Sequence, residues 1–249
     1  MIITHPTEHK WIEIITENPI SELGKNNQAR IRSSLNAIDK TTISYSIEPL
    51  TNEILDWFVP LYQKTINAKS NPNPYDIAAN TINKNSKFNY FALILRENDI
   101  PIGATIFSKR THIVSIAYRI YPHNWLHNNL QASPSLFSEY LINKYGYAEG
   151  YKKLAHGKDR NPYGLNASIG LALFKLSVGC NVYLPSTPYE IKNLDLDSVT
   201  EDILLFEMPI GDEKQISKGY LYVTEANLTK YENVTKYPNQ IKIEVILRN

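Results

Sequence analysis

The stretch from His156 to Cys180, HGKDRNPYGLNASIGLALFKLSVGC, decides the fold predicted for this chain. It begins as a polar, turn-rich segment and continues as an apolar segment that ends at Gly179. Apolar residues recur at helical spacing on two faces, which predicts a helix buried nearly all round. These residues are Leu165, Ile169, Leu173 and Leu176 on one face, and Leu171, Phe174 and Val178 on the other. Asn166 or Ser168 could cap the start of the helix, and Gly179 could end it.

The polar half of this stretch is a candidate functional loop. A loop that leads into the positive end of a helix can hold a phosphate or a developing oxyanion. Lys158, Asn166 and Ser168 are therefore candidate ligands for an anionic group of a cofactor or substrate. An ordinary core helix that follows a surface loop would have the same sequence features, so this alternative stays open.

The composition is that of a globular protein of 249 residues, with 43% hydrophobic and 20% charged residues. A net charge of +1 argues against nucleic acid as a main partner, because phosphate contacts dominate such binding. The single cysteine, Cys180, cannot form an internal disulfide. The first 15 residues lack the features of a signal peptide, and no apolar run approaches the roughly 20 residues of a membrane span. We expect a cytoplasmic protein that does not bind membranes.

The first half of the chain alternates helices and strands. Residues 1 to 27 are mixed, with an apolar cluster near Trp11 that fits a short strand or helix. A helix is predicted over 28 to 40, a strand over 42 to 50, and a helix from Thr51 to about Ile66, with a second short helix over 76 to 83. Residues 88 to 121 read as three antiparallel strands, the first two joined by a turn at Asn98-Asp99.

The second half adds two helices and further strands. Ser133-Pro134 is a helix start, and its amides are a second candidate phosphate site, at Ser133 and Ser135. A short strand over 152 to 155 leads into the loop at His156. After the helix, a strand follows at 181 to 185, then a linker-like stretch over 186 to 202 and three more strands.

A metal is not expected. His123 and His127 have a four-residue spacing that suits a metal only on a helix, and their surroundings contain Pro122 and several asparagines. Neither a carboxylate nor a cysteine lies beside them to complete a site.

This order of elements resembles the GNAT-type acyltransferase fold. The segments LFSEYLINKYGYAEGYKKLAHG and IGLALFKLSVG resemble the second half of the GNAT and FemAB-like group. The matching positions are Gly146, Gly157, Gly170, Leu171, Phe174, Lys175 and Gly179. The resemblance implies an α+β fold with a mixed, mostly antiparallel sheet flanked by helices. The predicted domains are a helical or irregular segment over 1–40, the GNAT-like domain over 41–186, and a C-terminal β extension over 187–249 packed on the same domain.

The resemblance also implies an enzyme that moves an acyl group, from acetyl-CoA or another thioester, to the amine of a small molecule or peptide. The splayed sheet would expose backbone groups around Ser115 and Ala117 that polarise the carbonyl and help to bind the acyl donor. His156 or Asp159 would be the base. The tyrosine that often protonates the leaving thiolate in this fold would lie near Phe174, so Tyr163 is the nearest replacement. Structural roles for His156 and Tyr163 stay open.

Two other functions remain open. The glycine-rich loop with which GNAT enzymes hold coenzyme A is replaced here by HNWLHNNLQASPS, which has no glycine. The amides after Ser133 would then have to bind the pyrophosphate. One alternative is a non-catalytic binding or assembly module whose C-terminal strands form a partner surface or a homodimer interface. The other is an aminoacyl-tRNA-dependent, FemAB-like transferase.

Overall fold

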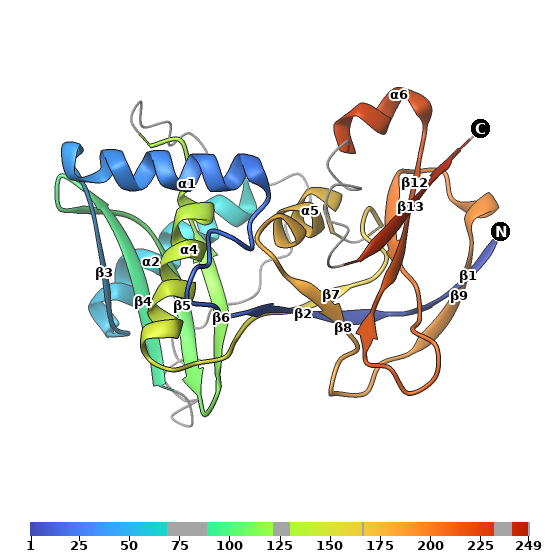
Figure 1. The fold of residues 1–249 in the computed structure, drawn as a ribbon, viewed down its shortest axis with the longest axis horizontal. Helices are drawn as coiled ribbons and strands as arrows, with labels where there is room; N and C mark the ends of the chain where they lie inside the picture. Colours follow the sequence, from blue (N-terminus) through green and yellow to red (C-terminus); the bar gives the residue numbers. More distant parts are fainter. Residues whose placement is uncertain (69–88, 122–129, 166, 232–240, 249) are drawn as a thin grey trace. The chain divides into compact units, whose positions relative to one another are not determined.

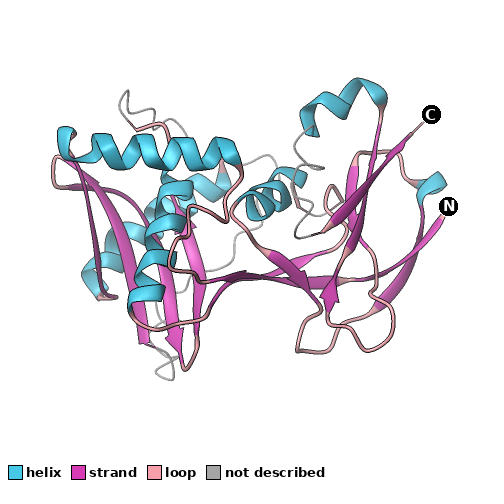
Figure 2. Cartoon of the chain, viewed as in Figure 1, coloured by secondary structure: helices cyan, strands magenta, loops and turns pink. Residues whose placement is uncertain are grey.

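The computed structural model describes residues 1–249 except 69–88, 122–129, 166, 232–240 and 249. The chain divides into two compact units. Unit 1 comprises Met1–Ile14, Glu22–Gly24 and Ala155–Asn249, and unit 2 comprises Ile15–Ser21 and Lys25–Leu154. Both units combine helices with mostly antiparallel strands (Figure 2), which confirms the predicted α+β class and the extra C-terminal strands.

Unit 2 contains an antiparallel sheet in the order β6-β5-β4-β3. Its strands are β3 (Ile43–Pro49), β4 (Asn89–Glu97), β5 (Ile100–Arg110) and β6 (Ile113–Ile120). Asn98 and Asp99 join β4 to β5 with φ angles of 49° and 64°, the left-handed geometry that a tight hairpin turn needs. The predicted three-stranded meander and its turn are therefore confirmed (Figure 1).

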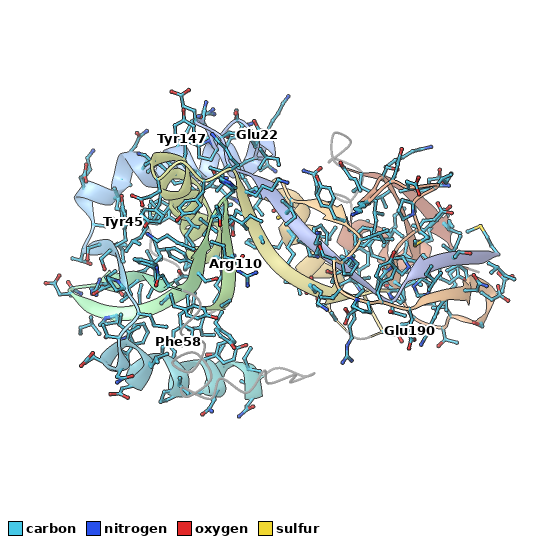
Figure 3. The ribbon with its side chains drawn as sticks, turned by 90° about the horizontal axis from the view of Figure 1, so that it is seen from below. Glu22, Tyr45, Phe58, Arg110, Tyr147 and Glu190 are labelled. Carbon is cyan, nitrogen blue, oxygen red and sulfur yellow. The ribbon has the colours of Figure 1, made fainter. Side chains whose placement is uncertain are left out.

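The helices of unit 2 are α1 (Lys25–Ala37), α2 (Asn52–Asn67) and α4 (Pro134–Ala148). Phe58 of α2 is fully buried in a core formed with one face of β4 and β5. Figure 3 labels Phe58 and, on the other face, Tyr45 of β3. The Tyr45 ring meets that of Phe137 of α4, with ring centroids 6.4 Å apart. Thr51 and Ser133 cap α2 and α4 as predicted. The predicted helix over 76 to 83 and the loop with His123 and His127 lie outside the described residues.

Unit 1 contains three groups of strands. The first is a four-stranded arrangement in the order β11-β8-β2-β7, the second is the pair β1-β9, and the third is β10-β12-β13, in which β12 and β13 run parallel. The elements are β1 (Ile2–Pro6), β2 (Glu8–Ile14), β7 (Lys153–Arg160), α5 (Ile169–Ser177), β8 (Asn181–Tyr183), β9 (Ile191–Asp195), β10 (Ile203–Phe206), β11 (Gln215–Ile216), β12 (Lys218–Val223), α6 (Glu225–Leu228) and β13 (Lys242–Leu247). In the part of the chain that the structure describes, no helix is long and apolar enough to span a membrane.

Two segments whose sequences show no clear alternation of hydrophobic and polar residues form strands. The first 14 residues form β1 and β2, so the apolar cluster near Trp11 is a strand, one of the two options predicted for it. The alternation in β2 was obscured because the buried positions include the polar residues His9 and Glu13 beside Trp11. The linker-like stretch over 186 to 202 contains β9, which pairs with β1 although its residues are mostly exposed. The predicted domain boundaries stay predictions.

The stretch from His156 onward also differs from the prediction in two respects. Strand β7 continues to Arg160, so His156 lies within a strand and not in a loop after it. Helix α5 is not buried all round, because Leu171 is 39% exposed whereas Lys175 is only 7% exposed. Leu165 precedes the helix. The predicted cap at Ser168 is confirmed, and Gly179 follows the helix with a φ of 95°.

Candidate functional site

A buried polar cluster in unit 1 brings together side chains from two strands, one helix and one connecting segment. We call it the Asp159 cluster, and its members are His9, Trp11, Asp159, Tyr163 and Lys175. His9 and Trp11 come from β2, Asp159 from β7, Tyr163 from the segment after β7, and Lys175 from α5. Charged and polar groups are rarely buried in this way unless they are paired.

Local backbone geometry brings these side chains to one place. His9 and Trp11 are two positions apart on β2, so they lie on the same face of the strand. Gly157 has a φ of 79° within β7, which interrupts the alternation of side chains. His156 and Asp159, three positions apart, can therefore both face inward. Helix α5 carries Lys175 on its buried side.

The Asp159 carboxylate is the centre of the cluster. Its Oδ2 atom lies 2.5 Å from the Lys175 ammonium and accepts a hydrogen bond of 2.9 Å from the Trp11 indole N–H. The Tyr163 hydroxyl donates to the same oxygen. Lys175 also donates to the backbone carbonyl of His156 at 3.2 Å. Among the described residues, Lys175 is the one lysine or arginine that is buried.

Tyr163 links the charged pair to the aromatic side of the cluster. Its hydroxyl accepts at 2.9 Å from the single Trp11 indole N–H, which is shared with Asp159, and lies 3.1 Å from His9 Nε2. Because the single Tyr163 proton goes to Asp159, His9 Nε2 carries the proton of the neutral imidazole. The Tyr163 backbone pairs with Leu204 of β10 in both directions, at 2.9 and 3.1 Å. The ring position is thus fixed from both ends.

Burial and charge shift the ionisation of three members of the cluster. Burial alone would raise the pKa of Asp159, but the charge and hydrogen bond of Lys175, together with the hydrogen bond from Tyr163, lower that pKa overall. Desolvation lowers the pKa of His9 to about 3, so this histidine is neutral. Burial, and then the charge of Asp159, raise the pKa of Tyr163 well above 10. The cluster therefore holds the cation of Lys175 and the anion of Asp159, whereas His9 and Tyr163 are neutral.

A second group of buried side chains lies in the same unit. His156 Nε2 is 3.3 Å from Glu13 Oε2, and both side chains are less than 5% exposed. Cys180 is fully buried, and one ligand atom from each of Glu13, His156 and Cys180 lies within 4.8 Å of the other two. We call this group the Glu13 triad.

The predicted site residues of unit 1 fall in different surroundings. Asp159 and Tyr163 meet in the Asp159 cluster, whereas the His156 side chain belongs to the Glu13 triad. Lys158 is exposed and contacts Glu8 Oε2 at 2.7 Å. The Ser168 hydroxyl accepts from the Gly170 amide in capping α5. Asn166 lies outside the described residues.

The predicted site residues of unit 2 lie on β6 and at the start of α4. The pairing of β6 with β5 shifts by one residue, so that Ile116 and Tyr118 face consecutive residues of β5 and Ala117 is left as a bulge. Ser115 pairs normally with Ser108. The Ser133 hydroxyl accepts from the Leu136 amide at 3.3 Å. The Ser135 carbonyl accepts from the Ser138 hydroxyl.

Sequence reasoning missed three members of the Asp159 cluster, namely His9, Trp11 and Lys175. Lys175 was noted only as a position in the GNAT-like motif, although a lysine on an apolar helix indicates either a solvated edge or a buried ion pair. The spacing of His9, Trp11 and Glu13 at alternate positions could have indicated one face of a strand. The contact of Lys175 with Asp159 had no signal in the sequence.

Comparisons with known proteins identify the fold. Neither a protein-family model nor a curated protein sequence matches this chain. Among solved structures, FemX is similar with a TM-score of 0.53 and 14% identity over 72% of this chain. L-PGS from Bacillus licheniformis has a TM-score of 0.44 and 12% identity over 71% of this chain. The C-terminal domain (DUF2156) of a putative lysylphosphatidylglycerol synthetase from Agrobacterium fabrum has a TM-score of 0.49 and 10% identity over 76%.

The likeness to FemX confirms the predicted fold. This chain has a divergent GNAT-like, FemAB-like fold. The matches cover 60% of the FemX chain, 54% of the L-PGS chain and 61% of the Agrobacterium domain, so this chain spans less than two thirds of their lengths.

Proposed function

We propose that this chain, with its divergent GNAT-like, FemAB-like fold, is a transferase that moves an acyl or aminoacyl group from a thioester or ester to an amine. The observation that carries the proposal is the buried ion pair of Lys175 and Asp159 in unit 1. Such a pair is not needed for a stable core, because apolar residues of similar volume often serve equally well. Its presence in a buried cluster favours a chemical role.

The reaction needs stabilisation of negative charge. When the amine nitrogen attacks the carbonyl carbon, a C–N bond forms and the carbonyl oxygen becomes an oxyanion. The C–S or C–O bond to the carrier then breaks, and the leaving group takes up a proton. The Lys175 ammonium has three N–H donors, of which two bind Asp159 and the His156 carbonyl. We assign Lys175 the stabilisation of the oxyanion or of the leaving group.

The other members of the cluster would position Lys175. The lowered pKa of Asp159 makes its carboxylate a weak base, which favours a role as the counter-ion of Lys175. Tyr163, whose hydroxyl points at Asp159, would hold that carboxylate in place. The raised pKa of Tyr163 keeps it protonated and able to donate this hydrogen bond. The predicted roles of Asp159 as a base and of Tyr163 as an acid stay predictions.

The predicted base His156 needs contact with the acceptor amine. Its Nε2 atom lies 3.3 Å from Glu13 Oε2, which favours a different role that is argued below. With His156 in that role, the amine could lose its proton to the leaving group or to water.

The donor is proposed as acetyl-CoA, another acyl-CoA or an aminoacyl ester, and the acceptor as a small-molecule or peptide amine. In unit 2, the bulged residue Ala117 leaves the regular ladder of β6, so its backbone groups can bind a ligand. The hydroxyls of Ser133 and Ser168 already serve as helix caps. Any phosphate contact there would come from backbone amides.

Thermal melting of the purified chain tests the proposal. Acetyl-CoA, longer acyl-CoAs, free coenzyme A and aminoacyl-tRNA would each be added at saturating concentration. A ligand at 100 times its dissociation constant adds about 2.7 kcal/mol of stability, which raises the melting temperature by several degrees. A shift with an acyl-CoA supports a thioester donor, and a salt-dependent shift with aminoacyl-tRNA alone supports an ester donor. Without any shift the proposal fails, and a non-catalytic binding module becomes the better account.

A further inference from the structure

We propose that the Glu13 triad, formed by Glu13, His156 and Cys180, is a binding site for one Zn²⁺ ion. The proposal concerns unit 1 alone and does not depend on the transferase function. The sequence predicts no metal site, because these three residues are far apart in the chain and follow no ligand motif. Folding brings them together.

Strand register explains why the three side chains meet. Strand β8 pairs with β2 in antiparallel register, with Trp11 opposite Val182 and Ile12 opposite Asn181. One further step along this register places Cys180 beside Glu13. Side chains directly opposite one another on paired strands have Cβ atoms about 5 Å apart. His156 comes from β7, the other neighbour of β2 in the sheet.

The distances fit a tetrahedral ion after a small closure. Zinc binds histidine nitrogen and carboxylate oxygen at about 2.0 to 2.2 Å, so two such donors on one tetrahedral ion lie roughly 3.4 Å apart. The His156 nitrogen and the Glu13 oxygen are 3.3 Å apart. The Cys180 sulfur, with the longer bond of about 2.3 Å that zinc makes to thiolate, lies within 4.8 Å of both.

The chemistry of the donors selects the metal. Thiolate and imidazole favour zinc and similar transition metals, whereas magnesium and calcium require oxygen ligands. Cys180 as a thiolate and Glu13 as a carboxylate would together balance the two positive charges of the ion. This balance matters because all three side chains are buried, where an uncompensated charge is costly.

The ion would also stabilise the neighbouring Asp159 cluster. It would join β2 and β7, which carry Trp11 and Asp159, to Cys180, whose backbone N–H donates to the Lys175 carbonyl at 3.1 Å. The His156 carbonyl accepts a hydrogen bond from Lys175, so a fixed His156 helps to fix the ammonium. With its imidazole on the metal, His156 would be a positioning residue and not a base.

Cobalt titration of the full chain tests the site. The purified protein is stripped with a chelator, kept reduced, and titrated with Co²⁺, whose bond to a thiolate gives an intense charge-transfer band in the near ultraviolet. We expect this band to saturate at one equivalent and to disappear when Zn²⁺ displaces Co²⁺. Cys180→Ser should remove the band, and Glu13→Gln should weaken cobalt binding by at least about tenfold. His5→Gln is the matched control, because His5 is a buried histidine of unit 1 on β1.

Three results would overturn the proposal. The first is a stripped wild-type chain that melts cooperatively and binds no Co²⁺ at an equimolar concentration. The second is bound Co²⁺ without the thiolate band. The third is a band that Cys180→Ser leaves unchanged. Because the wild-type titration decides the first two, a variant that fails to fold does not leave the question open. An effect of His5→Gln equal to that of Glu13→Gln would also count against the site.

Discussion

The Lys175 ammonium lies 2.5 Å from the Asp159 carboxylate, and both side chains are more than four fifths buried. Trp11 and Tyr163 donate to the same carboxylate oxygen. A buried pair with this many partners is sensitive to the removal of either charge but tolerant of the removal of both. The proposed transferase function adds a requirement for the ammonium itself.

Loss of Lys175 alone should destabilise the fold. Lys175→Met leaves the Asp159 carboxylate buried without its counter-ion, and we expect a loss of about 3 to 5 kcal/mol in the free energy of unfolding. The double variant Lys175→Met with Asp159→Asn should recover most of this loss. Urea denaturation measures both. Equal stability of the single variant and the wild type would show that the pair is not buried as described.

His9 should make the fold sensitive to mild acid. Its pKa is about 3 in the folded protein and 6.5 in the unfolded chain, so the unfolded chain binds the additional proton. The contribution of His9 to the free energy of unfolding is fully present above pH 6.5 and is lost as the pH decreases from 6.5 towards 3. Between about pH 7 and about pH 5 the free energy of unfolding should decrease by about 2 kcal/mol on account of His9.

His9→Phe provides the comparison for this pH dependence. The variant keeps His5, whose pKa is also lowered by burial, so the difference between the two proteins isolates His9. Denaturation at both pH values should show a smaller decrease for the variant by about 2 kcal/mol. Parallel curves for the two proteins would mean that His9 is solvated.

The Tyr163 hydroxyl should contribute to stability through its hydrogen bonds. Tyr163→Phe removes the donor to Asp159 and the acceptor for Trp11, and we expect a loss of about 1 to 3 kcal/mol. Tyr183→Phe, on β8 of the same unit, is the control and should change stability by less than about 0.5 kcal/mol. If both variants lose the same amount, the Tyr163 hydroxyl has no special role in the cluster.

Gly164 should not tolerate a side chain. A Cβ atom at this position would lie 2.2 Å from the backbone carbonyl oxygen of Asp202, and the φ angle is 102°. Gly211 also has a positive φ, of 68°, but a Cβ there meets nothing within 4 Å. A positive φ in alanine destabilises both variants by about 1 to 2 kcal/mol. Any further loss of stability in Gly164→Ala is therefore due to the clash of its Cβ atom with the Asp202 carbonyl oxygen. Thermal melting of the two variants gives this difference, and equal melting temperatures would contradict it.

The sequence predicted the elements whose burial follows hydrophobic periodicity. The meander of β4, β5 and β6 and the helix starts at Thr51 and Ser133 are local features, and all were predicted. Ser168 was one of two residues predicted to cap α5. Strand β2 was expected only as a short strand or helix near Trp11, because the buried positions beside Trp11 include the polar residues His9 and Glu13, which hydrophobic patterning cannot detect.

The candidate site could be predicted only in part. Asp159 was predicted as a candidate base at the end of a strand, and Tyr163 was predicted as the replacement for the tyrosine that the GNAT-type fold often has near Phe174. Their partners Trp11 and Lys175 lie 148 and 16 positions from Asp159, and only the packing of β2 and α5 brings them near. The polar cluster therefore depends on tertiary structure that no local pattern encodes.

The most direct test of the central claim is a transfer assay with the stable double variant as reference. Wild-type protein is incubated with labelled acetyl-CoA, longer acyl-CoAs or aminoacyl-tRNA and a set of small and peptide amines, and mass spectrometry detects the acylated amine. We expect product from the wild type and a rate about 100-fold lower for Lys175→Met with Asp159→Asn, since the ammonium is absent while the fold is retained. Equal rates for the two proteins, or no product from any donor with the wild type, would contradict the proposed role of Lys175.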